Sequence, residues 1–146
     1  MKDLPHHYVA SADAKAVGNI VLSSSGVDDL ISAAPAEFGG PGDEWSPEAL
    51  LVASVADCFI LSFRAVARAS KLEWESLSCS AEGVLARVER VTQFTAFNVS
   101  VTLDVPPGTD ESKAHRLLEK AEEVCLITNS LKAGSHLEAT VRVSAG

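Results

Sequence analysis

Residues 46–71 read SPEALLVASVADCFILSFRAVARASK, and this stretch decides the fold because it predicts one long helix that is apolar on nearly every side. Ser46 is suited to cap the first free N–H groups, Pro47 fits the first helical position, and Glu48 lies near the positive end of the helix dipole. At about 1.5 Å per residue such a helix would be roughly 35–39 Å long, the width of a whole small domain. A chain of this size is therefore expected to need a partner subunit to cover it.

Length and charge narrow the class of protein. The chain has 146 residues, which is enough for a single domain over 1–146 with a real hydrophobic core. The formal net charge of −8 argues against nucleic acid or an anionic membrane as a partner. The first ten residues, MKDLPHHYVA, do not read as a signal peptide, and the apolar run 49–61 is too short to span a bilayer. We therefore expect a cytoplasmic protein.

The segments before the long helix read as short strands and a loop. Residues 6–15 read as a strand or an irregular lead-in, and residues 19–23 and 28–33 predict two strands of a hairpin. Residues 35–45, PAEFGGPGDEW, are too rich in Gly and Pro for a helix or a central strand. This loop is either a plain connector or one wall of a cleft.

The segments after the long helix predict two further strands, a second helix and a last strand. Residues 73–89 and 94–105 alternate apolar and polar side chains, which predicts an antiparallel hairpin with a bulge at Gly83. Thr109 is expected to cap an amphipathic helix that carries Cys125 at the end of its apolar stripe. A short helix capped near residue 128 or 129 and a strand over 136–144 follow. The sum is an α+β fold of antiparallel sheets packed on a long central apolar helix and a second amphipathic helix.

Three cysteines, Cys58, Cys79 and Cys125, are the candidates for chemistry. They form no CxxC pair, and the four histidines form no HExxH or HxH pattern, so we expect neither a disulfide framework nor a metal site. Taken singly, each cysteine is typical of a small buried core residue. Cys58 and Cys125, however, each lie on the inward face of a predicted helix. If those helices pack together, the two thiols could come within disulfide reach, which in a reducing compartment indicates redox chemistry.

Three segments resemble the signature region of the OsmC/Ohr family of organic hydroperoxide reductases. They are Phe38-Gly39-Gly40-Pro41-Gly42, then Ser46-Pro47-Glu48-Ala49-Leu50-Leu51, and then Ala56-Asp57-Cys58-Phe59. Cys125, in Glu122-Glu123-Val124-Cys125, is similar to the family's second cysteine, and the order of elements agrees along the whole chain. The resemblance implies the OsmC-like fold as an intertwined homodimer with two sites at its interface.

The resemblance also implies a thiol peroxidase without metal or organic cofactor. Cys58 would attack the peroxide and become a sulfenic acid, and Cys125 would condense with it to a disulfide. A dithiol reductant, a lipoylated protein in this family, would then reduce that bridge. An apolar pocket lined by Phe59 and Phe63 would favour alkyl and fatty-acid hydroperoxides.

Glu48 matches the family's active-site glutamate, and its position has a geometric consequence. It precedes Cys58 by ten residues, about 15 Å along one helix, so the two side chains of one subunit cannot touch. If both serve one site as the resemblance implies, Glu48 must arrive from a second chain across a two-fold axis as an orienting carboxylate. Without the resemblance, Glu48 reads as a first-turn residue favoured by the helix dipole.

One position departs from the family pattern. The family holds its thiolate with an arginine from the N-terminal part or the Gly-rich loop, whereas the first arginine here is Arg64, six residues after Cys58 on the same helix. A buried cysteine without a cation is expected to have a raised pKa. Two other readings therefore stand beside the peroxidase. One is an OsmC-like protein with little peroxidase activity that binds a small apolar ligand in the same interface cleft, and the other is a purely structural dimer module.

Overall fold

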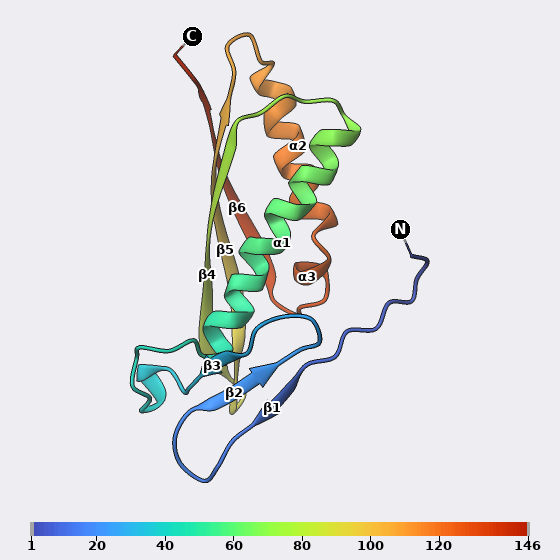
Figure 1. Cartoon of the computed structure of the whole chain (residues 1–146). Coiled ribbons are helices and arrows are strands. Elements are labelled where there is room, and N and C mark those ends of the chain that lie inside the picture. Colours follow the sequence, from blue (N-terminus) through green and yellow to red (C-terminus); the bar gives the residue numbers. More distant parts are fainter. Residues whose placement is uncertain (1, 146) are drawn as a thin grey trace. The chain divides into compact units, whose positions relative to one another are not determined.

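The computed structural model describes residues 2–145 and divides the chain into two compact units, Met1–Leu50 and Leu51–Gly146 (Figure 1). The elements alternate between strands and helices in an α+β arrangement with two separate sheets, which confirms the predicted fold class. The expectation of a single domain over 1–146 stays a prediction.

The first unit contains a small antiparallel sheet and the glycine-rich loop. Its strands β1 (Ser11–Asp13), β2 (Ile20–Ser23) and β3 (Leu30–Ser32) pair in chain order, so the predicted hairpin is confirmed. The loop holds one turn of 3-10 helix, η1 (Ala36–Phe38). A side chain at Gly40 would collide with the backbone carbonyl of Ala34, so the tight path of this loop requires glycine there.

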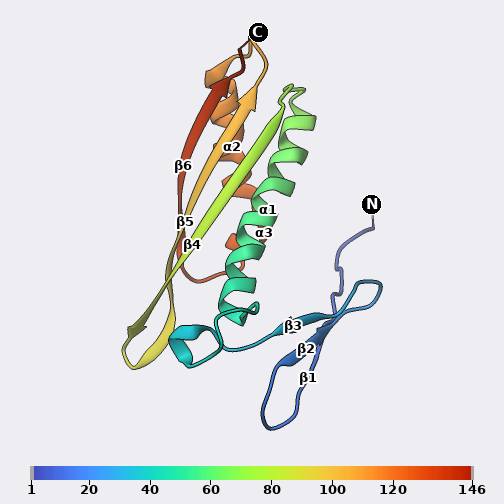
Figure 2. The same ribbon diagram turned by 60° about the vertical axis from the view of Figure 1, so that its left-hand side comes forward.

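The second unit is a three-stranded sheet with helices on one face (Figures 1 and 2). Helix α1 (Pro47–Ala69) leads into it, and the sheet consists of β4 (Ser76–Val88), β5 (Val91–Val105) and β6 (Gly134–Val143) in the order β4-β5-β6. Helices α2 (Glu111–Val124) and α3 (Leu126–Asn129) connect β5 to β6. The core lies between the helices and the sheet and includes Phe59, Phe63, Phe97, Leu103 and Leu118.

The pairing of the last strand corrects the expectation that the strands are all antiparallel. β4 and β5 form the predicted antiparallel hairpin, but β6 runs parallel to β5. Parallel neighbours need a long crossover connection, usually a helix, and α2 with α3 supplies it. The direction of β6 thus follows from the helices that precede it and not from the strand's own alternating pattern.

Two local expectations are also corrected. The cap of α2 is Asp110, whose carboxylate accepts the N–H of Lys113 at 3.2 Å, whereas the hydroxyl of Thr109 donates to the carbonyl of Pro106 at 2.7 Å. Thr109 is therefore used by the preceding turn. The register between β4 and β5 shifts between Val84 and Leu85, whose partners are Ala96 and Phe94, so the extra residue is Thr95 of β5 and the predicted bulge at Gly83 is wrong.

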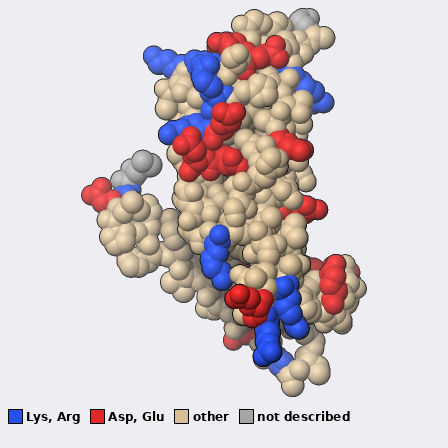
Figure 3. All heavy atoms as spheres, turned by 180° about the vertical axis from the view of Figure 1, so that it is seen from behind, with Lys and Arg blue, Asp and Glu red and all other residues tan. Residues whose placement is uncertain are grey.

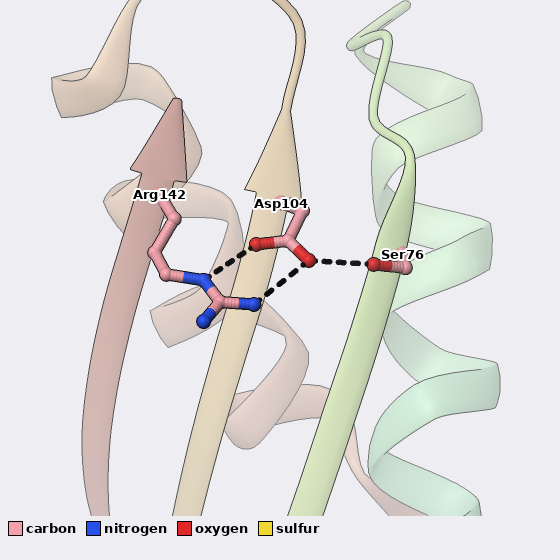
Figure 4. Close-up of polar contacts among 3 residues, drawn as sticks. All are labelled: Ser76, Asp104 and Arg142. Atoms are coloured by element: carbon pink, nitrogen blue, oxygen red, sulfur yellow. Dashed lines mark hydrogen bonds and ion pairs between the residues drawn. The ribbon is translucent and has the colours of Figure 1, made fainter. Parts of the chain in front are cut away.

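The face of the sheet opposite the helices carries polar side chains, and a row of three ties its strands together (Figure 4). Asp104 of β5 accepts from Arg142 of β6 through two hydrogen bonds of 2.7 and 3.1 Å, and from the hydroxyl of Ser76 of β4 at 2.8 Å. These donors lower the pKa of the Asp104 carboxyl, the Arg142 hydrogen bond most. On the side of the molecule that Figure 3 shows, acidic and basic side chains are interspersed.

Candidate active site

Helix α1 places Cys58 on the inside of the second unit. The hydroxyl of Ser46 accepts the N–H of Ala49 at 3.1 Å, which confirms Ser46 as the cap of this helix. Along the helix, Val55, Phe59 and Phe63 are almost fully buried, and Cys58 shares their face with only 9% of its surface exposed. The helical repeat therefore turns the thiol toward the core.

Cys125 lies where the chain leaves α2 and begins α3. Its backbone is extended (φ −64°, ψ 107°), and its carbonyl accepts the N–H of Asn129 at 3.0 Å and the hydroxyl of Thr128 at 3.2 Å. The short helix thus begins at Leu126, earlier than the predicted cap near residue 128 or 129. Because a helix leaves its first N–H groups without intrahelical partners, this start frees the N–H of Ile127 for a contact elsewhere.

The structure brings Cys58 and Cys125 together. Cys125 and the backbone N–H of Ile127 both lie close enough to the Cys58 thiol to act on its ionisation. The hydroxyl of Ser62, one turn further along α1, lies 3.9 Å from the same sulfur. Both cysteines are free thiols, and Cys125 is 2% exposed. The arrangement is a pair of free thiols, both buried.

The surroundings of Cys58 oppose its ionisation on balance. Burial raises the pKa of the Cys58 thiol because water no longer solvates the thiolate, and the neighbouring Cys125 raises it further. The N–H of Ile127 and the hydroxyl of Ser62 act in the other direction because they donate to the negatively charged sulfur. The net pKa is raised, and no cation of residues 2–145 is among the groups that act on it.

Two of these groups were not identified from the sequence. The N–H of Ile127 is a backbone donor, and its availability depends on where α3 begins. The side-chain pattern predicted a later start for this helix. Ser62 follows Cys58 by four residues, and this helical spacing is the signal that could have revealed it. The predicted pocket residues Phe59 and Phe63 are core residues, and the ring of Phe63 packs edge-on against Trp74 with centroids 5.4 Å apart.

Cys79, expected to be an inert core residue, also belongs to this neighbourhood. It is half-buried on the inward face of β4 between the exposed Ser78 and Ser80. Burial raises the pKa of the Cys79 thiol to about 11, and the nearby Cys125 adds to this shift. Cys125 is therefore near enough to Cys79 to act on the ionisation of its thiol.

Glu48 is half-buried in the first turn of α1 and is separate from the thiol pair along the helix. Its ten-residue distance from Cys58 corresponds to about 15 Å of helix. Its Oε1 atom is buried and has no hydrogen-bond partner within residues 2–145. A buried carboxylate oxygen without a donor is costly, so this atom is suited to receive a donor from outside the chain.

Other polar groups do not form a metal centre. A hollow of about 490 Å³ between α2 and β6 is lined by side chains that include His115, Glu119, Glu122 and Ser135. Within the described residues, no three His, Cys, Asp or Glu side chains are arranged to hold a metal ion. The thiol pair is thus the candidate site with the clearest chemistry.

Sequence comparisons connect this chain with known proteins. A family model described as OsmC-like protein matches residues 40–140. The uncharacterized protein YmaD of Bacillus subtilis (strain 168) is 29% identical over 132 residues, which are 88% of this chain and 83% of that protein. An organic hydroperoxide resistance protein of Xanthomonas axonopodis pv. citri (strain 306) is 30% identical over 135 residues, 90% of this chain and 91% of that protein.

Solved structures share the fold. An OsmC-like protein of unknown function from Vibrio cholerae O1 biovar eltor matches with a TM-score of 0.84 and 18% identity, covering 92% of this chain and 99% of the other. An organic hydroperoxide resistance protein from Elizabethkingia anophelis matches with a TM-score of 0.77 and 24% identity, covering 99% of this chain and 100% of the other. At these identities the likeness concerns the fold alone.

Proposed function

The chain belongs to the OsmC-like protein family, and we propose that it is a thiol-dependent peroxidase that reduces organic hydroperoxides to alcohols. The observation that carries the proposal is the proximity of the Cys58 and Cys125 thiols, the first from the middle of α1 and the second from the end of α2, both buried. A cysteine peroxidase that resolves its own sulfenic acid requires a second free thiol close to the first. The name of the Xanthomonas relative supports the substrate class.

The reaction would proceed in two thiol steps. The Cys58 thiolate attacks the outer oxygen of the hydroperoxide, the O–O bond breaks, and the organic alkoxide leaves as an alcohol after taking a proton. Cys58 is then a sulfenic acid. Cys125 attacks the Cys58 sulfur, a disulfide forms, and the hydroxyl group leaves as water. The peroxide has accepted two electrons, and the two thiols have lost them.

The N–H of Ile127 would take part of the role that a cation has elsewhere in the family. It lowers the pKa of the Cys58 thiol and so would stabilise the attacking thiolate. Arg64, the first arginine, lies on the exposed side of α1. Because the pKa of Cys58 is raised, the rate of attack should increase with pH.

An external dithiol would complete the cycle by reducing the disulfide, and a lipoylated protein is the reductant we propose. Two successive thiol–disulfide exchanges transfer the two electrons and return Cys58 and Cys125 to thiols. A buried dithiol pair that has to be re-reduced in every cycle suits a reducing compartment, so we propose the cytoplasm as its location.

We also propose that the working form is a homodimer. In length and composition α1 would pass for a membrane-spanning helix, yet one side of it is packed in the core through Phe59 and Phe63. Only 17% of its most apolar window is buried within one chain, and Leu61 is 54% exposed. A second α1 would cover the exposed side of the helix and bring Glu48 of one chain to the Cys58 site of the other.

A second candidate function is supported by the raised pKa of Cys58. A thiol that ionises with difficulty reacts slowly with peroxides, so an OsmC-like protein with little peroxidase activity could instead bind a small apolar ligand at the same interface. In that case hydroperoxide would not be consumed.

The test is turnover of cumene hydroperoxide with dihydrolipoamide as reductant. We expect wild type to consume peroxide catalytically, Cys58→Ser to fall to the rate without protein, and Cys125→Ser to stop after about one equivalent because its sulfenic acid is not resolved internally. Ser80→Ala, on the opposite face of β4, is the matched control and should retain the wild-type rate. Wild-type protein that leaves the peroxide unconsumed from pH 6 to 10 would favour the ligand-binding function instead.

A further inference from the structure

Helix α1 carries one serine a turn before Cys58 and another a turn after it. Ser54 precedes the cysteine by four residues, and Ser62 follows it by four. Both serines are half-buried. Because residues four apart are neighbours on the surface of a helix, each hydroxyl is a candidate partner for the sulfur.

The two serines use their hydroxyls differently. Ser54 donates to the backbone carbonyl of Leu51 at 2.6 Å, a common local bond of a helical serine. The hydroxyl of Ser62 instead lies 3.9 Å from the Cys58 sulfur, which is its hydrogen-bond partner among residues 2–145. Of the two serines in α1, it is therefore Ser62 whose hydroxyl is directed at the thiol.

The tilt of helical side chains explains the difference. In an α-helix the Cα–Cβ bonds point toward the N-terminus, so a side chain leans over the turn that precedes its own. Ser62 therefore leans back over Cys58, whereas Ser54 leans back toward Leu51 and away from the cysteine. A serine after the cysteine thus makes the contact that a serine before it does not.

A hydroxyl can stay in contact with the sulfur before and after the thiol ionises, since either atom of this pair can be the donor. The neutral thiol donates its proton to the hydroxyl oxygen, and the thiolate accepts the hydroxyl hydrogen. The backbone N–H of Ile127, the other group that favours the thiolate, can only donate. Ser62 can therefore hold the sulfur in both protonation states.

The remaining titratable and charged groups around the sulfur do not supply this stabilisation. Cys125, at the end of α2, disfavours the thiolate. On α1 itself, the charged side chains of Asp57 and Arg64 are exposed. Cys79 of β4 is not among the groups within residues 2–145 that act on the ionisation of Cys58. The side-chain donor that acts on the sulfur is thus the hydroxyl of Ser62.

We propose that Ser62 is a further catalytic residue, whose hydroxyl donates to the Cys58 thiolate and holds the sulfur for its attack on the hydroperoxide. This rests on the proposed peroxidase function, in which that thiolate is the nucleophile. The proton that Cys58 loses passes to solvent, and Ser62 forms no covalent bond and keeps its own proton. As the S–O bond forms, the negative charge moves from the sulfur to the leaving alkoxide.

Two opposing effects set the size of the contribution. Loss of a hydrogen bond to the charged sulfur should lower the fraction of thiolate about tenfold while the thiol predominates. The remaining thiolate should be about threefold more reactive, because nucleophilicity rises with roughly half the change in pKa. The net loss is then roughly threefold, and it should vanish as the pH approaches full ionisation of Cys58. A distorted helix would slow the reaction at every pH.

The first experiment measures the ionisation of Cys58 without peroxide. Alkylation by iodoacetamide is followed by peptide mass spectrometry from pH 6 to 11, after circular dichroism has verified that each variant is folded. In Ser62→Ala the midpoint of the profile should move to higher pH, and alkylation at pH 8 should be roughly threefold slower. Ser62→Thr retains a hydroxyl and should stay within about 1.5-fold of the wild-type rate.

Ser54→Ala is the matched control, because its hydroxyl is bonded to its own backbone, and its profile should equal that of wild type. An unmoved midpoint in Ser62→Ala would overturn the proposal. A loss in Ser62→Thr as large as that in Ser62→Ala would do the same, since the effect would then come from packing and not from the hydroxyl.

The second experiment connects the hydroxyl with the peroxide step. In the Cys125→Ser background, where the sulfenic acid is not resolved internally, single-turnover consumption of cumene hydroperoxide at pH 8 should be roughly threefold slower with Ser62→Ala. Adding Ser54→Ala should leave the rate unchanged. A deficit of equal size at every pH would indicate a structural role and overturn the proposal. If Ser62→Ala shifts the alkylation profile but Cys125→Ser consumes no hydroperoxide, the proposed function fails while the hydrogen bond to the thiolate stands.

Discussion

The chemistry of Cys58 depends on a few atoms in contact with its sulfur. Burial and Cys125 raise the pKa of this thiol. The N–H of Ile127 and the hydroxyl of Ser62 both lower it. None of these groups is a cation, so the site relies on neutral donors where a guanidinium would be expected from the family pattern. A neutral N–H stabilises a thiolate less than a charged donor does.

The first prediction concerns the ionisation of Cys58 when Cys125 is removed. In Cys125→Ala the pKa of Cys58 should fall toward the ordinary thiol value of 9.0, because two of the causes that raise it are lost. The measurement is the pH profile of Cys58 alkylation by iodoacetamide, followed by peptide mass spectrometry. Cys79→Ala removes a thiol that does not act on Cys58 and should leave the profile unchanged. An unaltered or higher midpoint in Cys125→Ala would contradict the described contact.

At the scale of elements, α1 rests on β4 at Gly83. Gly83 lets the helix approach, and its neighbours are Val52 of α1 and Phe94 of β5, whose ring is stacked with that of Phe97 at 5.3 Å. A strand glycine at a point of close approach is typical of such helix–sheet packing.

The second prediction follows from this close approach. In Gly83→Ala the new Cβ would lie 2.8 Å from both Val52 Cγ2 and Phe94 Cε1, so the core must shift, and we expect a loss of about 1–3 kcal/mol in the free energy of unfolding. The measurement is urea denaturation followed by circular dichroism. Gly134→Ala is the matched control: nothing lies within 4 Å of its Cβ position, so its stability should change by less than about 0.5 kcal/mol. Equal stability of the two variants would show that α1 does not rest on Gly83.

At the scale of the whole molecule, α1 leaves an apolar side open and Glu48 leaves a buried oxygen without a donor among residues 2–145. One event, association of two chains along α1, would satisfy both. The proposed dimer would therefore bury the apolar side of α1. It would also complete each site, since the orienting carboxylate would come from the other chain.

The third prediction is complementation between two inactive chains. Cys58→Ser should have no peroxidase activity, and Glu48→Gln should have little. After subunit exchange in an equal mixture, activity should recover to about a quarter of the wild-type rate, because half of the dimers would each contain one intact site. Cys58→Ser mixed with the double variant carrying both Cys58→Ser and Glu48→Gln is the control and should stay inactive. No recovery despite confirmed exchange would place Glu48 outside the partner's site.

Much of the fold and part of the candidate site could be predicted because they depend on neighbours in sequence. The cap at Ser46, the length of α1 and the inward direction of Cys58, Cys79 and Cys125 follow from helix and strand periodicity. The pairing of β6 and the start of α3 were predicted wrongly, since a parallel crossover and a displaced cap leave no distinct local pattern.

The sequence by itself thus determined which elements form and which thiols point inward, since these properties arise within a few residues along the chain. Only the tertiary structure decided that Cys125 and the N–H of Ile127 lie close enough to Cys58 to act on its ionisation. The physical reason is that such contacts depend on how helices far apart in sequence cross one sheet. A shift of one helical turn, about 5.4 Å, would separate the sulfur atoms without altering any local pattern.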